Sequence, residues 1–383
     1  MFENPITNSG KTPIMIVITA IIILQVISLR PYNYNMSAAL KIDAHLDPIP
    51  EFWPKGFVIY EKGGYDGMYY YYVANDPLYT KKKLHNPYRY QRIFFSVLTK
   101  IIALDNNKVF PSVMFGINLF FLGLGMAFVM KILEKYKKNR WWVLLYGLSP
   151  PAIMTTMDLI PSSVSVSLGI IAIYYLIDNR IKISVACFAV AMLTREDAVL
   201  VFLVVLLWDF WEKRDFSRST FLAISIIPFL AWHFYIFNSV DGTGLDTSSG
   251  VISKIPFIGI FHYFFYEAEF NGVMGIKNAI SFSFFIFVMF AVWSLYKTKA
   301  YQNIYGIITL IYCILTVFTV ASQWDNFNGL NRMFYNIYPF LILSFAVIGD
   351  RRMKPVVLLI GGYSLLTFMR IIFIHPVYPY FLS

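Results

Sequence analysis

Charged residues are scarce in this 383-residue sequence. They make up 14% of the chain, whereas 58% of the residues are hydrophobic and the mean hydropathy is +0.59. A soluble core cannot absorb so much apolar surface, so the composition excludes an ordinary soluble protein. It predicts an all-α fold, a polytopic bundle of transmembrane helices.

Cysteine is scarce as well. The two cysteines, Cys187 and Cys313, lie inside apolar runs and are expected to be small core residues, so they give no information on disulfides or compartment. The sequence also lacks a low-complexity linker, a charged tail and an evident internal repeat. These absences predict a single membrane domain over residues 1–383 and do not support a transporter built from inverted halves.

The first apolar run is not followed by a signal-peptide cleavage site. Residues 14–29 come after a short polar N-terminus, and Arg30-Pro31-Tyr32 stands where small residues would be expected, which predicts an uncleaved first span. Residues 93–104 are apolar but short, and they predict an interfacial helix. About 11 spans are predicted, over residues 14–29, 109–131, 141–157, 159–177, 183–194, 197–211, 219–237, 281–297, 303–321, 335–349 and 355–373.

The basic residues behind the net charge of +10 lie mainly in short breaks between these runs. Under the positive-inside rule the breaks are cytoplasmic, which places the N-terminus inside and the C-terminus outside. Anionic lipid headgroups, and not nucleic acid, are the partners that such charges favour. The long segments 30–108, 238–280 and 322–334 are then external and carry many of the acidic residues. A functional site is therefore expected on the external face.

The most distinctive stretch lies in the first external segment and reads GGYDGMYYYYVANDP over residues 63–77. A helix is predicted from Asp66 to Ala74, because Asp66, Tyr69 and Tyr70 have the spacing of one helix face. Two interpretations of Asp66 are open. Its carboxylate is either functional, or it caps the helix while the tyrosines form an interfacial belt.

Two arginines follow in the stretch NPYRYQRI, residues 86–93. Guanidinium forks suit phosphate geometry better than ammonium groups do, so Arg89 and Arg92 are candidates for binding a phosphate. The simpler interpretation is that both side chains reach phospholipid headgroups.

Three further polar stretches have two interpretations each. Residues 194–197, TRED, are either a polar hairpin tip or present a cavity-facing arginine that Glu196 holds. Residues 323–332 form either a plain connection or a loop over a sugar site. His262, with Glu267 and Glu269, matches no metal-binding spacing, which favours solvated loop residues over a divalent site. Asp158 is predicted to cap the helix that follows it.

Taken together, these motifs resemble the membrane-embedded GT-C superfamily of glycosyltransferases. The resemblance rests on YDG with its aromatic run and AxDP (residues 65–77), on YRYQRI (88–93) and on LTRE (193–196). It is nearest to small bacterial members and looser to the glycolipid-anchor mannosyltransferase II family. The specific motifs cover only residues 64–93 and 193–197, while the rest of the likeness is one of general layout.

The resemblance implies an inverting hexosyltransferase in the bacterial inner membrane. Such an enzyme takes a sugar from a polyprenyl-phosphate carrier and attaches it, on the external face, to a glycan, lipid or protein acceptor. By the match of motif, Asp66 takes the catalytic or metal-binding role, which leaves a divalent cation as an open candidate for a cofactor with unknown ligands. The residues expected to bind substrate are Arg89, Arg92, Arg195, Glu196, Tyr69, Tyr70, Asp76, Trp324, Asp325 and Arg332.

The sequence departs from the family pattern in one respect. Many members place the acidic residue directly after the first span, where this chain has RPYNY over residues 30–34. Asp43 and Asp47 are therefore rival candidates for the catalytic role.

Two other classes of function remain open. A transporter or flippase of lipid-linked sugars would carry charges in the middle of its spans, which are nearly free of charge here. A non-catalytic assembly protein would need no clustered aspartate and arginine beside an aromatic loop. The chemistry of an inverting transfer, in contrast, uses a carboxylate base and cations that stabilise a leaving phosphate.

Overall fold

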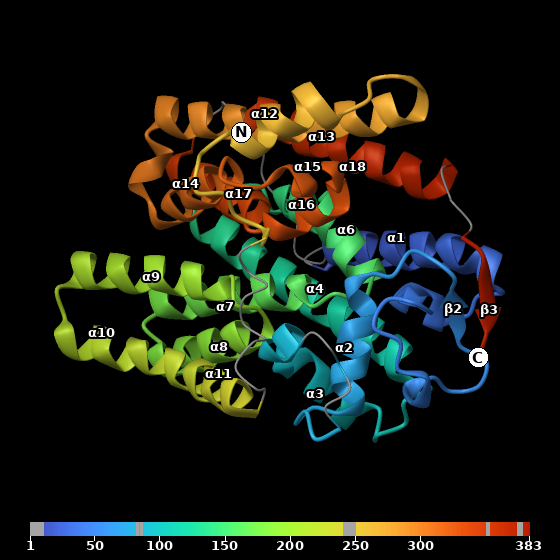
Figure 1. Ribbon diagram of the computed structural model, residues 1–383. Helices are drawn as coiled ribbons and strands as arrows, with labels where there is room; N and C mark the ends of the chain where they lie inside the picture. Colours follow the sequence, from blue (N-terminus) through green and yellow to red (C-terminus); the bar gives the residue numbers. More distant parts are fainter. Residues whose placement is uncertain (1–10, 82–83, 85–86, 240–249, 350–352, 374–377) are drawn as a thin grey trace.

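The computed structural model describes residues 11–81, 84, 87–239, 250–349, 353–373 and 378–383. The prediction of an all-α membrane bundle is confirmed, since helices account for most of these residues (Figure 1). Five helical stretches among them are long and apolar enough to cross a membrane, by length and composition. They are Thr12–Tyr32, Phe110–Lys135, Phe216–Ser239, Met274–Thr298 and Val356–Phe373.

All eleven predicted apolar runs are helical in the structure. The helices that correspond to them are α1 (Thr12–Leu29), α4 (Phe110–Lys135), α5 (Val143–Gly147), α6 (Pro150–Met157), α7 (Ser162–Ile177), α8 (Ile181–Thr194), α9 (Ala198–Lys213), α10 (Phe216–Ala223), α11 (Ile227–Ser239), α13 (Gly272–Thr298), α14 (Ile304–Thr316), α17 (Ile337–Ile348) and α18 (Met353–Phe373). The run 141–157 is divided between α5 and α6, because Pro150 and Pro151 can begin a helix but cannot continue one.

Short helices fill the segments between the long ones. The prediction of a helix over residues 93–104 is confirmed by α3 (Ile93–Ile102), which packs against α2 (Asp66–Asn75), α4 and α8. The remaining short α-helices are α12 (Ile258–His262), α15 (Ala321–Asp325) and α16 (Phe327–Met333).

A small three-stranded sheet was not predicted. It consists of β1 (Ile42–Asp43), β2 (Val58–Tyr60) and β3 (Tyr380–Leu382), with β1 parallel and β3 antiparallel to β2. The C-terminal strand β3 therefore pairs with the segment that follows α1. This pairing confirms that the C-terminus and the first long segment share one face of the bundle.

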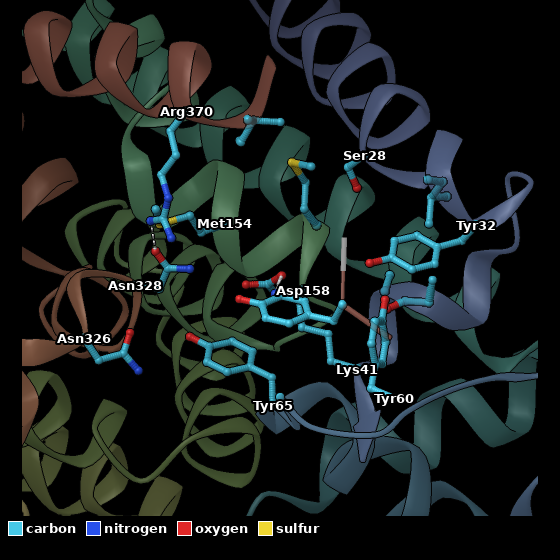
Figure 2. Close-up of a pocket in the computed structure, with 17 residues that line it drawn as sticks. Ser28, Tyr32, Lys41, Tyr60, Tyr65, Met154, Asp158, Asn326, Asn328 and Arg370 are labelled. Atoms are coloured by element: carbon cyan, nitrogen blue, oxygen red, sulfur yellow. Dashed lines mark hydrogen bonds and ion pairs between the residues drawn. The ribbon is translucent and has the colours of Figure 1, made fainter. Parts of the chain in front are cut away.

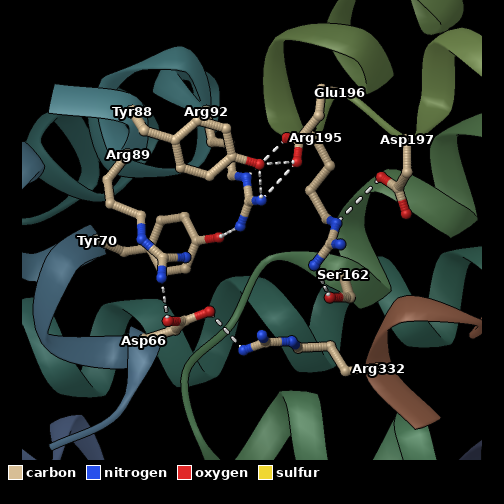
Figure 3. A network of polar contacts seen from close by, with 10 residues as sticks. All are labelled: Asp66, Tyr70, Tyr88, Arg89, Arg92, Ser162, Arg195, Glu196, Asp197 and Arg332. Atoms are coloured by element: carbon tan, nitrogen blue, oxygen red, sulfur yellow. Dashed lines mark hydrogen bonds and ion pairs between the residues drawn. The ribbon is translucent and has the colours of Figure 1, made fainter. Parts of the chain in front are cut away.

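Polar contacts show that the segments predicted to be external meet at one end of the bundle. Lys41 pairs with Asp158 (Figure 2), and Asp66 pairs with Arg332 (Figure 3). At the opposite end, Arg218 donates to the side chain of Asn179 across two of the short basic segments. The segment 350–352, which belongs to another predicted basic break, lies outside the described residues. These contacts confirm that segments 30–108 and 322–334 lie together, whereas the side of the membrane on which they lie stays a prediction.

Candidate active site

Helix α2 starts at Asp66, at a point where the backbone passes very close to other segments. The following residue is Gly67, and a Cβ added there would lie 2.7 Å from the carbonyl oxygen of Asp158 and 3.1 Å from that of Leu40. Only glycine fits such an approach, so the Asp-Gly pair lets the helix begin against this backbone. Asp66 is held in the first turn as a result, and its carboxylate is buried.

Two arginines from distant parts of the chain bind the Asp66 carboxylate. Arg89, in the 3₁₀ turn Pro87–Gln91, places Nη2 2.8 Å from Oδ1, and Arg332, in α16, places Nη1 2.5 Å from Oδ2. The cap of α2 is Tyr65, which has no side-chain capping bond. The interpretation of Asp66 as a helix cap is therefore wrong, because its oxygens bind arginines.

Arg92, which is buried, forms a second ion pair beside the first, with the partly exposed Glu196. Its Nε and Nη2 donate to the two carboxylate oxygens of Glu196 at 2.7 and 2.5 Å, which is the bidentate fork expected of a guanidinium group. The remaining donor, Nη1, reaches the hydroxyl of Tyr70 at 2.8 Å. Tyr88 donates to Glu196 and accepts from Arg92, so it closes the network.

Arg195 lies next to this network but has a different partner from the predicted one. Its Nε donates to Asp197 at 3.0 Å and its Nη1 to Ser162 at 2.7 Å. The expectation that Glu196 holds Arg195 is wrong. The backbone of Arg195 is extended, with φ −155° and ψ 137°, so that consecutive side chains point in opposite directions and Glu196 faces Arg92 instead.

These three sets of contacts lie close together, and we call them the arginine cluster (Figure 3). In the described part of the chain it consists of Arg89, Arg92, Arg195 and Arg332 with Asp66, Glu196 and Asp197. Four guanidinium groups face three carboxylates, which leaves one positive charge in excess. The Nε atoms of Arg89 and Arg332 are buried and have no hydrogen-bond partner among the described residues. Buried donors of this kind are normally paired.

The pKa values of Asp66 and Glu196 are both lowered. Burial alone raises the pKa of Asp66, but Arg332 and Arg89 outweigh burial and hold the pKa well below its usual range. Burial likewise raises the pKa of Glu196, and Arg92 outweighs it, so that this pKa is also lowered.

Tyrosines form the walls of the arginine cluster. The ring of Tyr69 lies under the guanidinium of Arg89, 4.8 Å from its centroid to Cζ, and its hydroxyl donates to Asp47 at 3.0 Å. The ring of Tyr65 lies 5.3 Å from Cζ of Arg332. The aromatic run after Asp66 thus shields the charges from solvent and contacts the arginines directly.

Three of the predicted substrate-binding residues lie outside this cluster. Asp76 accepts hydrogen bonds from the backbone of Thr80 and Lys81, and so it stabilises the turn after α2. Trp324 is fully buried among phenylalanines, so its ring is not accessible for stacking on a sugar. Asp325 pairs with Lys277 at 2.8 Å and accepts from the hydroxyl of Tyr263 at 3.0 Å.

The rival aspartates have structural contacts. Asp43 accepts four backbone N–H bonds, which fix a turn of the first segment. Asp47 accepts from Tyr69, as described above. Asp158 was expected to cap α7, but its carboxylate pairs with Lys41 at 2.7 Å, and that expectation is wrong.

No group of three histidine, cysteine, aspartate or glutamate side chains is placed to hold a metal ion within the described ranges. His262 and Glu267 form a pair at 2.9 Å on an exposed surface. A divalent cation therefore remains an open candidate for a cofactor, with unknown ligands.

Sequence reasoning missed Lys41, Tyr65, Tyr88 and Ser162 as neighbours of the site. Tyr65 and Tyr88 stand inside the quoted motifs, so proximity in sequence could have indicated them. Lys41 and Ser162 have no local signal, because their partners are 117 and 33 residues away in the chain.

Comparisons with known proteins give one match. No curated protein and no solved structure is similar to the chain at a significant level. Residues 64–382 match the EpsG family, and this range contains every member of the arginine cluster. The chain therefore belongs to the EpsG family, a family of membrane glycosyltransferase-like proteins.

Proposed function

We propose that this protein is a GT-C-type hexosyltransferase. It takes a sugar from a polyprenyl-phosphate carrier and attaches it, with inversion, to a glycan, lipid or protein acceptor on the external face of the bacterial inner membrane. The family match supports the coarse class of membrane glycosyltransferase-like proteins. The finer assignment rests on the chemistry of the arginine cluster.

The excess of guanidinium donors over carboxylates is the observation that carries the proposal. The buried Nε atoms of Arg89 and Arg332, the two arginines that bind Asp66, lack partners among the described residues. The cluster also contains four guanidinium groups but only three carboxylates, so it has one positive charge in excess. A phosphate offers several acceptor oxygens and matches the fork of arginine. A polyprenyl phosphate is the leaving group of the proposed reaction, and cations that receive its developing charge accelerate the transfer.

Asp66 has two states in this mechanism. In the free protein it is held by Arg89 and Arg332, and it is a weak base because its pKa is lowered. When the donor phosphate takes up guanidinium donors, Asp66 loses part of this stabilisation and its basicity rises. It then accepts the proton of the acceptor hydroxyl while the bond from the sugar to the phosphate breaks. Carboxylate and phosphate thus alternate as partners of the same arginines.

A transporter or flippase is a weaker explanation of the same geometry. The paired charges of the cluster lie at one end of the bundle, between α2, α16 and the short connection from α8 to α9, and not along a path through the spans. A non-catalytic assembly protein has no use for buried donors without partners, since each of them costs stability.

The direct test is a transfer assay with purified protein in lipid nanodiscs and a panel of polyprenyl-phosphate sugars. Release of polyprenyl phosphate is expected with at least one donor, and Arg332→Gln is expected to abolish it. Arg180→Gln is the matched control, because Arg180 is an exposed arginine at the other end of the bundle. Equal release from parent and Arg332→Gln would contradict the proposal.

Cysteine labelling tests the external location. Cys187→Ala removes the partly exposed native thiol, and the other cysteine is buried. In this background, Lys62→Cys is expected to react with an impermeant maleimide on intact cells. Arg180→Cys is expected to react only after permeabilisation, and the reverse pattern would place the arginine cluster in the cytoplasm.

A further inference from the structure

A cavity of about 320 Å³ opens beside the arginine cluster (Figure 2). It is bounded by α1, α6 and α18 on one side and by the first external segment on the other. Part of its wall is apolar and includes Leu29, Met154 and Ile371. Its volume is at the lower end of the range for small-molecule sites, which suits a ligand about the size of one sugar ring.

Another part of the cavity wall is polar and aromatic. Lys41 and Asp158 form an ion pair at 2.7 Å in this wall, and Arg370 donates to Asn328 at 2.6 Å. Four tyrosines complete the lining, namely Tyr32, Tyr60, Tyr65 and Tyr378. The wall therefore combines hydrogen-bond donors, hydrogen-bond acceptors and flat ring faces, the three features by which proteins bind the hydroxyl groups and the C–H faces of a saccharide.

Tyr65 is the partition between this cavity and the arginine cluster. One of its neighbours is Nζ of Lys41, 4.9 Å from the ring centroid on the cavity side, and another is the guanidinium of Arg332 on the cluster side. Asp66 follows Tyr65 directly in the chain, at the start of α2. A ligand in the cavity would thus contact Tyr65, the residue that directly precedes the candidate catalytic aspartate.

We infer that the cavity binds the acceptor saccharide, an inference that rests on the proposed function. The two binding regions differ in how their hydrogen-bond donors are paired. The arginine cluster has buried donors without partners and suits the phosphate of the donor. In the cavity, both cations already have partners, since Lys41 pairs with Asp158 and Arg370 donates to Asn328, and its wall suits hydroxyl groups.

The transfer step follows from this placement. An acceptor hydroxyl oxygen attacks the anomeric carbon of the donor sugar from the Tyr65 side and forms the new C–O bond. The bond from that carbon to the phosphate oxygen breaks, and its electron pair leaves with the polyprenyl phosphate at the arginines. The hydroxyl proton goes to the carboxylate of Asp66.

Photolabelling tests the inference without depending on transfer. The probes are diazirine-bearing methyl glycosides of glucose, galactose, mannose and N-acetylglucosamine, each applied to the purified full chain. At least one is expected to label the cavity wall, at Met154, Tyr60 or Tyr378, and an excess of the unlabelled glycoside is expected to compete. A photoreactive polyprenyl phosphate serves as the rival probe.

Two variants sharpen the result. Tyr378 is 45% exposed at the rim, and Tyr378→Ala is expected to lower labelling by about 2- to 10-fold through the loss of its ring face. The double variant Lys41→Met/Asp158→Asn removes the ion pair without leaving a lone charge, and it is expected to lower labelling by about 10-fold or more. Tyr266→Ala is the matched control, since Tyr266 is an exposed tyrosine that does not line the cavity.

The outcomes separate this inference from the proposed function. Glycoside labelling elsewhere, labelling unchanged in both variants, or cavity labelling by the polyprenyl phosphate alone would overturn the inference. Transfer could still occur in each of those cases. If labelling maps to the cavity and no donor supports transfer, the saccharide site stands and the proposed function fails. If transfer occurs, the double variant is expected to raise the KM for the acceptor and leave the KM for the donor unchanged.

Discussion

Asp43 and Asp66 are both buried carboxylates in the segment after α1, and their contacts differ in kind. Asp43 accepts four backbone N–H bonds at 2.7 to 3.1 Å, all from residues within about one turn of the chain or from the Gly63-Gly64 turn. Asp66 accepts from two arginine side chains, one of them 266 residues away. The pKa is lowered in both, against the effect of burial.

The comparison shows that burial and a perturbed pKa do not by themselves identify a functional carboxylate. The partners of Asp43 are fixed by the backbone and cannot be exchanged without unfolding the turn. Gly63 has a φ of +113°, and a Cβ at Gly64 would lie 2.8 Å from Cβ of Asp43, so the turn is built around this carboxylate. The partners of Asp66 are arginine side chains whose Nε donors have no partner among the described residues, and under the proposed function a substrate anion takes these arginines over.

The largest expected effect is on transfer in Asp66→Asn. Asparagine removes the charge and the basicity, so transfer per folded molecule is expected to fall by about 10²-fold or more. The variant also leaves Arg89 and Arg332 without a countercharge, which destabilises the fold. The double variant Asp66→Asn/Arg332→Gln reduces that charge excess. It is expected to regain thermal stability in detergent without regaining transfer, whereas recovery of transfer would mean that Asp66 acts only through folding.

The next effect concerns the fork of Arg92. Lysine keeps the charge but cannot donate to both oxygens of Glu196 and to Tyr70 together, so Arg92→Lys is expected to lower transfer by about 10-fold or more, nearly as far as Arg92→Ala. Transfer rates for both variants, with the exposed Arg180→Lys as a control, check this. Parent-like transfer in Arg92→Lys would mean that Arg92 acts through its positive charge alone and not through the geometry of its guanidinium group.

Asp43→Asn is expected to change stability and not chemistry. An amide group would face the N–H groups of Gly63 and Gly64 with its own donors, so the free energy of unfolding should fall by about 1–3 kcal/mol. Below its melting temperature the variant should transfer sugar at a rate within about 2-fold of the parent. A stable Asp43→Asn protein without transfer would mean that Asp43 has the catalytic role and Asp66 the structural one.

The smallest effect is the pH dependence of stability near neutrality. Because the folded pKa values of Asp43, Asp66 and Glu196 are lowered, these groups contribute stability above the unfolded carboxyl pKa values, about 4. That contribution is lost as the pH falls through the folded values. Thermal melting should therefore be nearly flat from about pH 7 to 5 and decline only below about pH 4. A steep decline between pH 7 and 5 would contradict the lowered pKa values.

The helices could be predicted because long apolar runs have few alternatives in a chain of this composition. Every run in the sequence became a helix, and the helix that begins at Asp66 was predicted from the spacing of its tyrosines. The pairing of β3 with β2 could not be predicted. Three-residue strands carry no alternation that distinguishes them from other loop residues, and the partners are separated by most of the chain.

The gathering of Asp66, Arg89, Arg92, Arg195 and Arg332 at one end of the bundle followed from the predicted topology, which placed them all on one face. The individual pairs did not follow from it. Which arginine meets Glu196 depends on the extended backbone at Arg195, and the burial of Trp324 depends on aromatic packing from α13. Such choices are made by tertiary contacts that a single sequence does not display.

The affinity of the purified protein for polyprenyl phosphate, measured by titration calorimetry in nanodiscs, tests the central claim most directly. If Asp66 and the carrier phosphate compete for the same arginines, Asp66→Asn should bind polyprenyl phosphate about 10-fold more tightly than the parent does while its transfer is lost. Tighter binding with lost transfer is the result that the exchange of carboxylate for phosphate predicts. Unchanged or weaker binding in a folded Asp66→Asn protein, with transfer close to that of the parent, would contradict it.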